Sequence, residues 1–282
     1  MLSGSRHFFK ASDFSKLICL CVPLIVSATT FASPYADSVV SFNQGSGGSP
    51  FYANPGSSLG EPARMTGIGS FPGVVSMFNP PFDGNQIVSI GLGGSLTVHF
   101  DQPITNDPSH LYGMDLIVFG NTGFIDSNYP NGQIGTPTGL FGEDNAHVEV
   151  SSDGISFFAV SPTADTLFPT QGYLDSGPYD VAPGSQPTDF LKPVNPSRSL
   201  SSFNGLTFAQ AMALYDGSGG GTPIDIAEAG LSSVSYVRIS VAANAAGPAE
   251  IDAFAAVPEP ASAILLVAGV VMLSRRRAVR HS

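Results

Sequence analysis

Apolar and polar residues alternate along several short segments of the chain, with the two-residue period of a β-strand. The clearest segment is 95–100, SLTVHF, in which Leu96, Val98 and Phe100 share one face. The segment 114–119, MDLIVF, is a nearly continuous apolar run, which is typical of a strand buried on both faces. Further strands are expected at 38–42, 86–91, 147–150, 155–160, 235–241 and 251–257.

Turn residues between these segments predict antiparallel pairing. Asp153-Gly154 follows 147–150 and precedes 155–160, a pattern that predicts a hairpin with a two-residue turn. The stretches 120–145 and 161–204 have little periodicity and are expected to be loop-rich inserts. Many short strands with few helices predict an all-β fold, an antiparallel, jelly-roll-like β-sandwich with long Gly/Pro-rich loops.

Only two segments have helical signals. Thr207 is a suitable N-cap for a short helix over 208–215. Asp225 and Glu228 have the spacing of a capping box, and Gly230 is expected to end that turn of helix. We therefore expect a single β-sandwich domain over residues 33–256.

The N-terminus has the features of a secretory signal peptide over residues 1–32. Arg6, Lys10 and Lys16 precede the apolar stretch 17–26, and small residues surround Ala32, after which cleavage is expected. The alternative is an N-terminal anchor helix. Pro23 and the shortness of the apolar run disfavour it, because a membrane-spanning helix needs about 20 apolar residues.

The C-terminal residues 257–282 have a second distinctive pattern. A Pro-Glu-Pro box is followed by the apolar run 261–273 and then by a cluster of arginines, which is expected to stay on the cytoplasmic side. The residues that form this pattern are Pro258, Glu259, Pro260, Arg275, Arg276 and Arg277.

This arrangement resembles the PEP-CTERM sorting signal. The resemblance implies a membrane enzyme, exosortase, that recognises and removes the tail. The protein would be tethered to the inner membrane before processing. It would then reach the cell surface or extracellular matrix of a Gram-negative bacterium. The alternative is that the tail remains as a plain membrane anchor.

The charge balance restricts the classes of partner. Charged residues make up 12% of the chain and the net charge is −11, which argues against nucleic acid because phosphate binding needs clustered cations. Both cysteines, Cys19 and Cys21, lie in the predicted signal peptide, so the exported chain has neither disulfides nor thiol chemistry. The surplus of acids fits a bound cation and equally fits simple solubility.

The body of the chain also resembles a group of bacterial exported surface proteins. The resemblance rests on the segments VSIGLGGSLTVHFDQPI at 88–104, GMDLIVFGN at 113–121, VEVSSDGISF at 148–157, GTPIDIA at 221–227, VRI at 237–239 and IDA at 251–253. It implies a galactose-binding-like jelly roll without a settled activity. Members of this group often have Glu where this chain has Gly120.

The sequence gives little sign of catalytic chemistry, and we expect no enzymatic activity. No two histidines have the His-x-x-x-His spacing that would favour zinc. A secreted hydrolase would need two carboxylates facing one cleft, which spacing along a sequence cannot establish.

Structural calcium is the more specific prediction. Glu250 and Asp252 flank Ile251, so their side chains are expected on one face of the last strand. In the jelly roll that the chain resembles, a calcium ion often links the last strand to nearby loops. Further oxygen donors near loop ends are Asp115, Asn121, Glu143 and Asp144. The alternative is that Asp252 caps a turn or bonds a backbone amide.

These observations predict an exported, non-enzymatic protein of the cell surface or extracellular matrix. The first alternative is a carbohydrate-binding module for extracellular polysaccharide, and the second is a secreted hydrolase. The absence of Trp weakens the carbohydrate alternative. Tyrosines offer flat stacking surfaces in its place, at Tyr112, Tyr129, Tyr173 and Tyr179.

Overall fold

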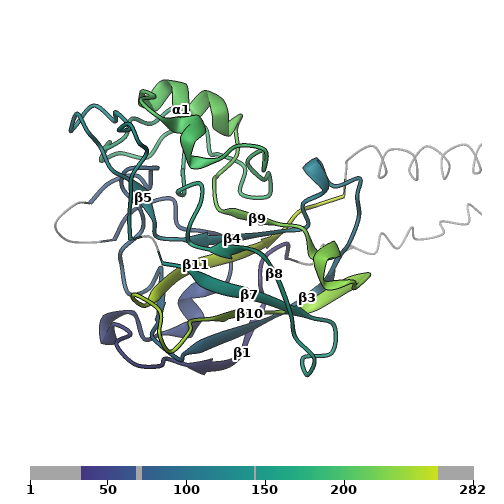
Figure 1. Ribbon diagram of the computed structural model, residues 1–282. Helices are drawn as coiled ribbons and strands as arrows, with labels where there is room; N and C mark the ends of the chain where they lie inside the picture. Colours follow the sequence, from purple (N-terminus) through teal and green to yellow (C-terminus); the bar gives the residue numbers. More distant parts are fainter. Residues whose placement is uncertain (1–32, 68–71, 143, 260–282) are drawn as a thin grey trace, which may run out of the picture. The chain divides into compact units, whose positions relative to one another are not determined.

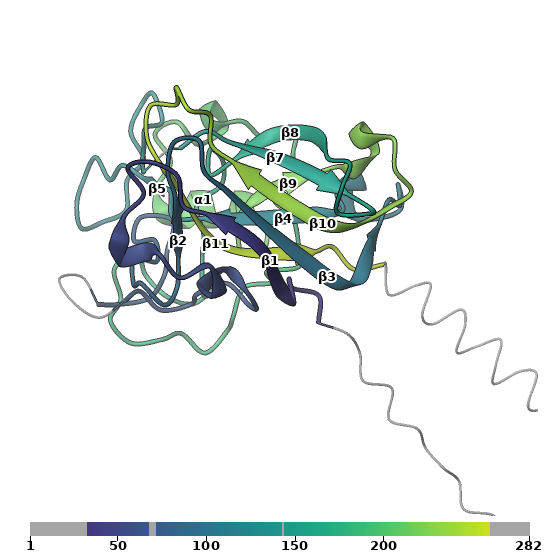
Figure 2. The same cartoon turned by 90° about the horizontal axis from the view of Figure 1, so that it is seen from below.

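Two antiparallel sheets form the body of the protein. The computed structural model describes residues 33–67, 72–142 and 144–259. The larger sheet has the strand order β1-β3-β10-β7-β8, and every neighbouring pair is antiparallel. Figure 2 views the molecule from the side of this sheet. Its strands are β1 (Ser38–Asn43), β3 (Ser95–Thr105), β7 (Ala146–Ser151), β8 (Phe158–Ala164) and β10 (Ser233–Ser240).

The second sheet has four strands and lies above the first in the view of Figure 1. Its order is β2-β11-β4-β9, again antiparallel throughout. The strands are β2 (Val88–Ile90), β4 (Leu116–Gly120), β9 (Thr222–Ile224) and β11 (Ala249–Ala256). A separate pair joins β5 (Gly123–Phe124) and β6 (Leu140–Phe141). The predicted all-β, antiparallel β-sandwich is confirmed.

The main hydrophobic core lies between the two sheets. Leu96, Val98 and Phe100 of β3 are all buried there, which confirms the face predicted from their alternation. Val118 of β4 and Phe254 of β11 face them from the second sheet. The sandwich is thus held by the apolar side chains of one face of each sheet.

The four-stranded sheet is buried on its outer face as well. Ile117 and Phe119 of β4 pack there with Ala253 and Ala255 of β11 and with Phe190 from a distant loop. Because β4 contacts apolar side chains on both faces, its sequence is a continuous apolar run, as predicted for segment 114–119.

The two inserts do more than connect strands. They fold over the outer side of the four-stranded sheet together with α1 (Phe208–Tyr215), as Figure 1 shows. A second apolar cluster holds them, and it includes Phe124, Phe168, Phe203 and Tyr215. From the sequence these stretches are expected only to be loops, because the contacts of this cluster join residues far apart in the chain and leave no periodic pattern.

The helical segments are short. Thr207 caps α1 by accepting a hydrogen bond from the Gln210 amide, as predicted. The segment after Asp225 is a 3₁₀ helix that ends at Gly230 in the left-handed conformation. The 3₁₀ helices are η1 (Pro50–Tyr52), η2 (Pro55–Ser58), η3 (Leu111–Gly113), η4 (Leu200–Phe203) and η5 (Ile226–Ala229).

The hairpin of β7 and β8 differs from the prediction in its turn. The strands pair as expected, with Val150 opposite Phe158, so the connection is longer than two residues. Asp153 accounts for the difference, because its Oδ1 accepts hydrogen bonds from Ser151 Oγ and from the amides of Ile155 and Ser156. These bonds stabilise a wider loop in which Asp153 acts as the organising side chain.

The predicted targeting segments lie mostly outside the described residues. This applies to the signal peptide, to Pro260 and to Arg275, Arg276 and Arg277, and also to Glu143. Within the part of the chain that the structure describes, no helix is both long and apolar enough to cross a membrane.

Candidate functional site

An aromatic pocket of about 330 Å³ lies beside the end of β4. Five separate parts of the chain form it: 78–82, Asn121 directly after β4, the loop that carries Tyr129, 141–142 at the end of β6, and the loop that carries Tyr179. The lining is mainly aromatic and proline side chains. Such a concave apolar site with few polar groups is typical of small-ligand binding.

Two of the four predicted tyrosines meet in this pocket. The rings of Tyr129 and Tyr179 lie 5.0 Å apart at an interplanar angle of 66°, and Tyr129 is 67% exposed. Tyr112 instead lies in η3, and Tyr173 lies beside Arg64, whose guanidinium carbon is 5.9 Å from the ring centroid. Tyr129 and Tyr179 therefore line the pocket, whereas Tyr112 and Tyr173 do not.

Asp126 holds the tyrosine pair in place. Its Oδ1 accepts hydrogen bonds from the backbone amides of Asn128 and Gln133. Its Oδ2 accepts one from the Gly132 amide and one, at 3.2 Å, from the Tyr179 hydroxyl. Burial opposes ionisation of Asp126, but these donors lower its pKa overall. The charged carboxylate therefore fixes both the loop that carries Tyr129 and the ring of Tyr179.

Asn121 supplies a polar group to the same pocket. It lines the pocket, and its side-chain Oδ1 is buried without a hydrogen-bond partner among the described residues. A buried acceptor that lacks a donor is costly unless a ligand or water satisfies it. The structure thus places one of the predicted calcium ligands in the aromatic pocket.

The other predicted calcium ligands are divided between two ends of the sandwich. Asp115 precedes β4, whereas Glu250 lies near Gly120, the last residue of that strand. At about 3.3 Å per residue these ends are roughly 15–20 Å apart. A calcium ion contacts oxygens at about 2.4 Å, so one ion does not join Asp115 to Glu250.

Asp115 and Asp252 have partners within the protein. Asp115 Oδ1 accepts the Asp107 amide and lies 2.7 Å from His110 Nδ1, while its Oδ2 accepts the Ile226 amide. Asp252 Oδ2 accepts the Ala63 amide at 3.0 Å, which is the alternative that the sequence analysis left open. Burial raises the pKa of Asp252 to about 8, against the lowering effect of the Ala63 amide.

Glu250 and Asp144 lie closer to a further acid, Asp165, that the sequence analysis missed. Asp165 Oδ1 accepts hydrogen bonds from both the amide and the hydroxyl of Thr122, whereas its buried Oδ2 has no hydrogen-bond partner among the described residues. Burial raises the pKa of Asp165 strongly, and the charges of Asp144 and Glu250 raise it further. Glu250 also accepts the Ser89 hydroxyl at 2.7 Å.

No sequence pattern identifies Asp165, because it lies in an insert with no periodicity. A structural signal does exist at Gly120, where a Cβ would lie 1.9 Å from Asp165 Oδ1. The carboxyl of Asp165 therefore occupies the space that any side chain at position 120 would need. Glycine is required at this position so that Asp165 can reach Thr122.

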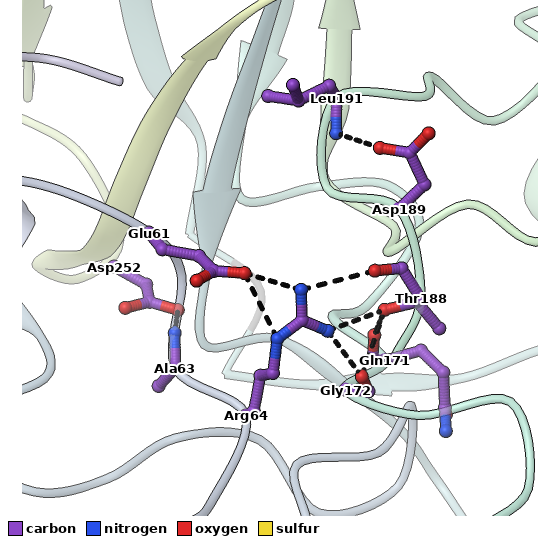
Figure 3. Close-up of polar contacts among 9 residues, drawn as sticks. All are labelled: Glu61, Ala63, Arg64, Gln171, Gly172, Thr188, Asp189, Leu191 and Asp252. Carbon is purple, nitrogen blue, oxygen red and sulfur yellow. Dashed lines mark hydrogen bonds and ion pairs between the residues drawn. The ribbon is translucent and has the colours of Figure 1, made fainter. Parts of the chain in front are cut away.

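Arg64 joins the N-terminal segment to the insert beside Asp252 (Figure 3). Its guanidinium donates to the carbonyl of Gly172 at 2.6 Å and to that of Thr188 at 3.2 Å, and it contacts Glu61 Oε1 at 2.5 Å. It also lies 4.0 Å from the ring centroid of Phe190. Arg64 thus connects segments more than a hundred residues apart in the sequence.

Comparison with protein-family models and with curated proteins finds no match to this chain. A proposal for its function therefore starts from the aromatic pocket, the group of acids around Asp165 and the terminal motifs.

Proposed function

We propose that this protein is an exported, non-enzymatic protein of the cell surface or extracellular matrix, and that its aromatic pocket binds a sugar unit of an extracellular polysaccharide. The observation that carries the proposal is the pairing of Tyr129 and Tyr179 beside the unpartnered Oδ1 of Asn121. Aromatic rings pack against the apolar face of a sugar. An amide oxygen accepts a hydrogen bond from a sugar hydroxyl.

The chemistry of the lining supports binding rather than catalysis. None of the described lining residues carries a carboxylate, an imidazole or a thiol. A glycoside hydrolase places two carboxyl groups about 5–9.5 Å apart around the scissile bond. A pocket of aromatic rings, prolines and amides favours holding a sugar over cleaving it, so the hydrolase is the weaker alternative.

Export and sorting rest on the two ends of the chain. Residues 1–32 would direct secretion, and the tail at 257–282 would be recognised by an exosortase-type enzyme in the inner membrane. Release of the tail would then deliver the domain to the surface or matrix of a Gram-negative bacterium. Retention of the tail as an anchor is the alternative outcome.

A structural calcium ion is a further part of the proposal. The support comes from Asp165, whose buried Oδ2 has no hydrogen-bond partner among the described residues and lies under the electrostatic influence of Asp144 and Glu250. Calcium prefers carboxylate, carbonyl and amide oxygens, which this end of the sandwich offers.

The sugar-binding proposal predicts that Tyr129→Ala weakens binding of the full chain to extracellular polysaccharide from the producing cells by about tenfold, because stacking contributes about 0.5–1.5 kcal/mol beyond the buried area. Isothermal titration or co-sedimentation measures the loss. The matched control is Phe51→Ala, since Phe51 is 65% exposed and forms a similar edge-on pair with Tyr52 at 5.0 Å, away from the pocket lining. Equal losses in both variants, or none in either, would reject the pocket.

Sorting is tested separately by mass spectrometry of the C-terminus after cell fractionation. Surface-released protein should lack Arg275, Arg276 and Arg277, and deletion of residues 257–282 should divert the protein to the periplasm or medium. An intact C-terminus on surface-released protein would contradict processing and leave the tail as an anchor.

A further inference from the structure

The Pro-Glu-Pro glutamate lies against the β-sandwich. Glu259 Oε1 accepts a hydrogen bond from Thr105 Oγ1 at 3.1 Å and lies 3.5 Å from Nε2 of His110. The chain reaches this position because the amide of Val257, just beyond β11, donates to the carbonyl oxygen of Asp115 at 2.9 Å. The start of the tail therefore meets the loop between β3 and β4.

His110 is buried and held in one orientation. Its side chain is 1% exposed, and its Nδ1 lies 2.7 Å from Asp115 Oδ1. Asp115 also accepts hydrogen bonds from two backbone amides, so it faces His110 as an acceptor and Nδ1 donates to it. In this tautomer the lone pair of the ring is on Nε2, which has no hydrogen-bond partner among the described residues.

Two acceptors therefore face each other. The Nε2 lone pair and the Glu259 carboxylate lie 3.5 Å apart, and a third acceptor, the carboxylate of Asp107, completes the group. The three ligand atoms all lie within 4.8 Å of one another. A cation bound between the two carboxylates and the lone pair would remove the repulsion among them.

The local fold prepares Asp107 and His110 for this role. Asp107 Oδ1 accepts the Ser109 amide at 2.8 Å, and the carbonyl oxygen of Asp107 accepts the His110 amide at 2.9 Å. This tight turn brings the two side chains to the same side. Asp115 behind His110 corresponds to the carboxylate that commonly orients a metal-binding histidine through its second ring nitrogen.

We propose that Asp107, His110 and Glu259 bind one divalent transition-metal ion, and that this ion fastens the first residues of the tail to the β-sandwich. One imidazole nitrogen with two carboxylates suits ions such as Zn²⁺ or Mn²⁺ better than Ca²⁺, which prefers oxygen alone. In a tetrahedral site with ligand bonds of about 2.0–2.1 Å the ligand atoms are about 3.3 Å apart. The His110–Glu259 distance of 3.5 Å already fits this spacing.

Zinc was not expected from the sequence, because no two histidines have the His-x-x-x-His spacing of ligands on one helix. Here the ligands come from a turn after β3 and from the residues after β11, more than 140 positions apart in the sequence. Asp115 enters as a positioning residue, not as the calcium ligand that was predicted.

The test is a titration of the full chain with ZnCl₂, measured by calorimetry after treatment with a chelator. Cys19 and Cys21 are replaced by Ser in every variant, because thiolates bind zinc. We expect one site, with affinity at least tenfold lower in His110→Gln, Asp107→Asn and Glu259→Gln. Glu259 is about half exposed, so Glu259→Gln tests the site without disturbing the core. CD melts of each variant check that it is folded.

The matched control is His99→Gln. His99 lies 3.4 Å from Asp101, but its side chain is 27% exposed and its nitrogens are not among the buried unpartnered atoms. His99→Gln should leave zinc affinity unchanged. A second readout is amide exchange at Glu259, which zinc should slow in the parent chain and not in His110→Gln.

Three results would overturn the proposal. They are no zinc binding by the parent chain, equal affinity for CaCl₂, and loss of binding in His99→Gln or His147→Gln in place of His110→Gln. Zinc binding is measured on purified protein and does not depend on where the protein is sorted. Its failure is therefore distinguishable from failure of the proposed export and sugar binding.

Discussion

At the scale of single residues, Asp252 shows how burial changes the meaning of a sequence pattern. Two acids around Ile251 resemble a pair of cation ligands, but Asp252 is 3% exposed and accepts the Ala63 amide. Periodicity predicts that an acid lies on a strand face. It does not predict which loop covers that face, because the covering residue is 189 positions away in the sequence.

The raised pKa of Asp252 makes stability depend on pH. Since the pKa is about 8 in the folded protein and about 3.9 in an unfolded chain, the contribution of Asp252 is complete below about pH 4. It is lost as the pH rises through 8. Asp252→Asn keeps an acceptor for the Ala63 amide and stays neutral, so its free energy of unfolding should fall less between pH 5 and 9.

Urea unfolding at several pH values measures this effect. Each tenfold change in an acid dissociation constant corresponds to about 1.4 kcal/mol, so Asp252→Asn should be more stable than the parent chain by roughly a few kcal/mol at pH 9. Asp101→Asn, at a carboxylate whose side chain is 74% exposed, is the control and should follow the parent. Parallel pH profiles for the parent and Asp252→Asn would show that Asp252 is ionised in the folded state.

At the scale of elements, the sequence predicts the strands well, but it predicts poorly how the two inserts pack over the four-stranded sheet. The alternation at 95–100 and the apolar run at 114–119 correspond to β3 and β4, because burial on one face or both leaves a direct mark on local sequence. The inserts leave no such mark. Phe168, Phe203 and Tyr215 pack together from three separate segments, so no local window contains their pattern.

Substitution of Arg64 measures how much the contact between the N-terminal segment and the insert contributes to the free energy of unfolding. Arg64→Lys keeps the charge but loses the planar fork that reaches the carbonyls of Gly172 and Thr188 (Figure 3). We expect the free energy of unfolding to fall by about 1–3 kcal/mol, the range for hydrogen bonds to charged groups. The exposed Arg198→Lys should change it by less than about 0.5 kcal/mol. Equal effects in chemical denaturation would mean that the fork of Arg64 contributes no specific stability.

At the scale of the whole molecule, the candidate site was the least predictable part. Tyr129, Tyr179 and Asn121 each stood out in the sequence, but as members of two unrelated hypotheses. Only the folded chain places them in one pocket, because that pocket joins five segments that are far apart in the sequence. Asp165 was missed entirely, since its carboxyl fits into the space that the missing side chain of Gly120 leaves, and no local sequence pattern shows this contact.

The calcium proposal makes a prediction for the molecule as a whole. An ion that binds the folded chain and not the unfolded one raises stability by RT ln(1 + [Ca²⁺]/Kd), about 2.7 kcal/mol at a hundredfold excess over Kd. Thermal melts of the full chain should therefore shift upward in millimolar calcium relative to EGTA. The shift should shrink in Glu250→Gln and in Asp165→Asn, and it should fade as the pH falls and the carboxylates are protonated.

Asp115→Asn is not a suitable calcium test, because Asp115 holds His110 at the other end of β4. Asp252→Asn is the better control, since Asp252 is bonded to Ala63 and its replacement should leave the calcium shift in place. Magnesium separates specific binding from general screening of the acidic surface, because its small size demands a stricter octahedral geometry. An equal shift with magnesium would assign the effect to screening, and identical melts in calcium and EGTA would exclude a structural calcium ion at Asp165.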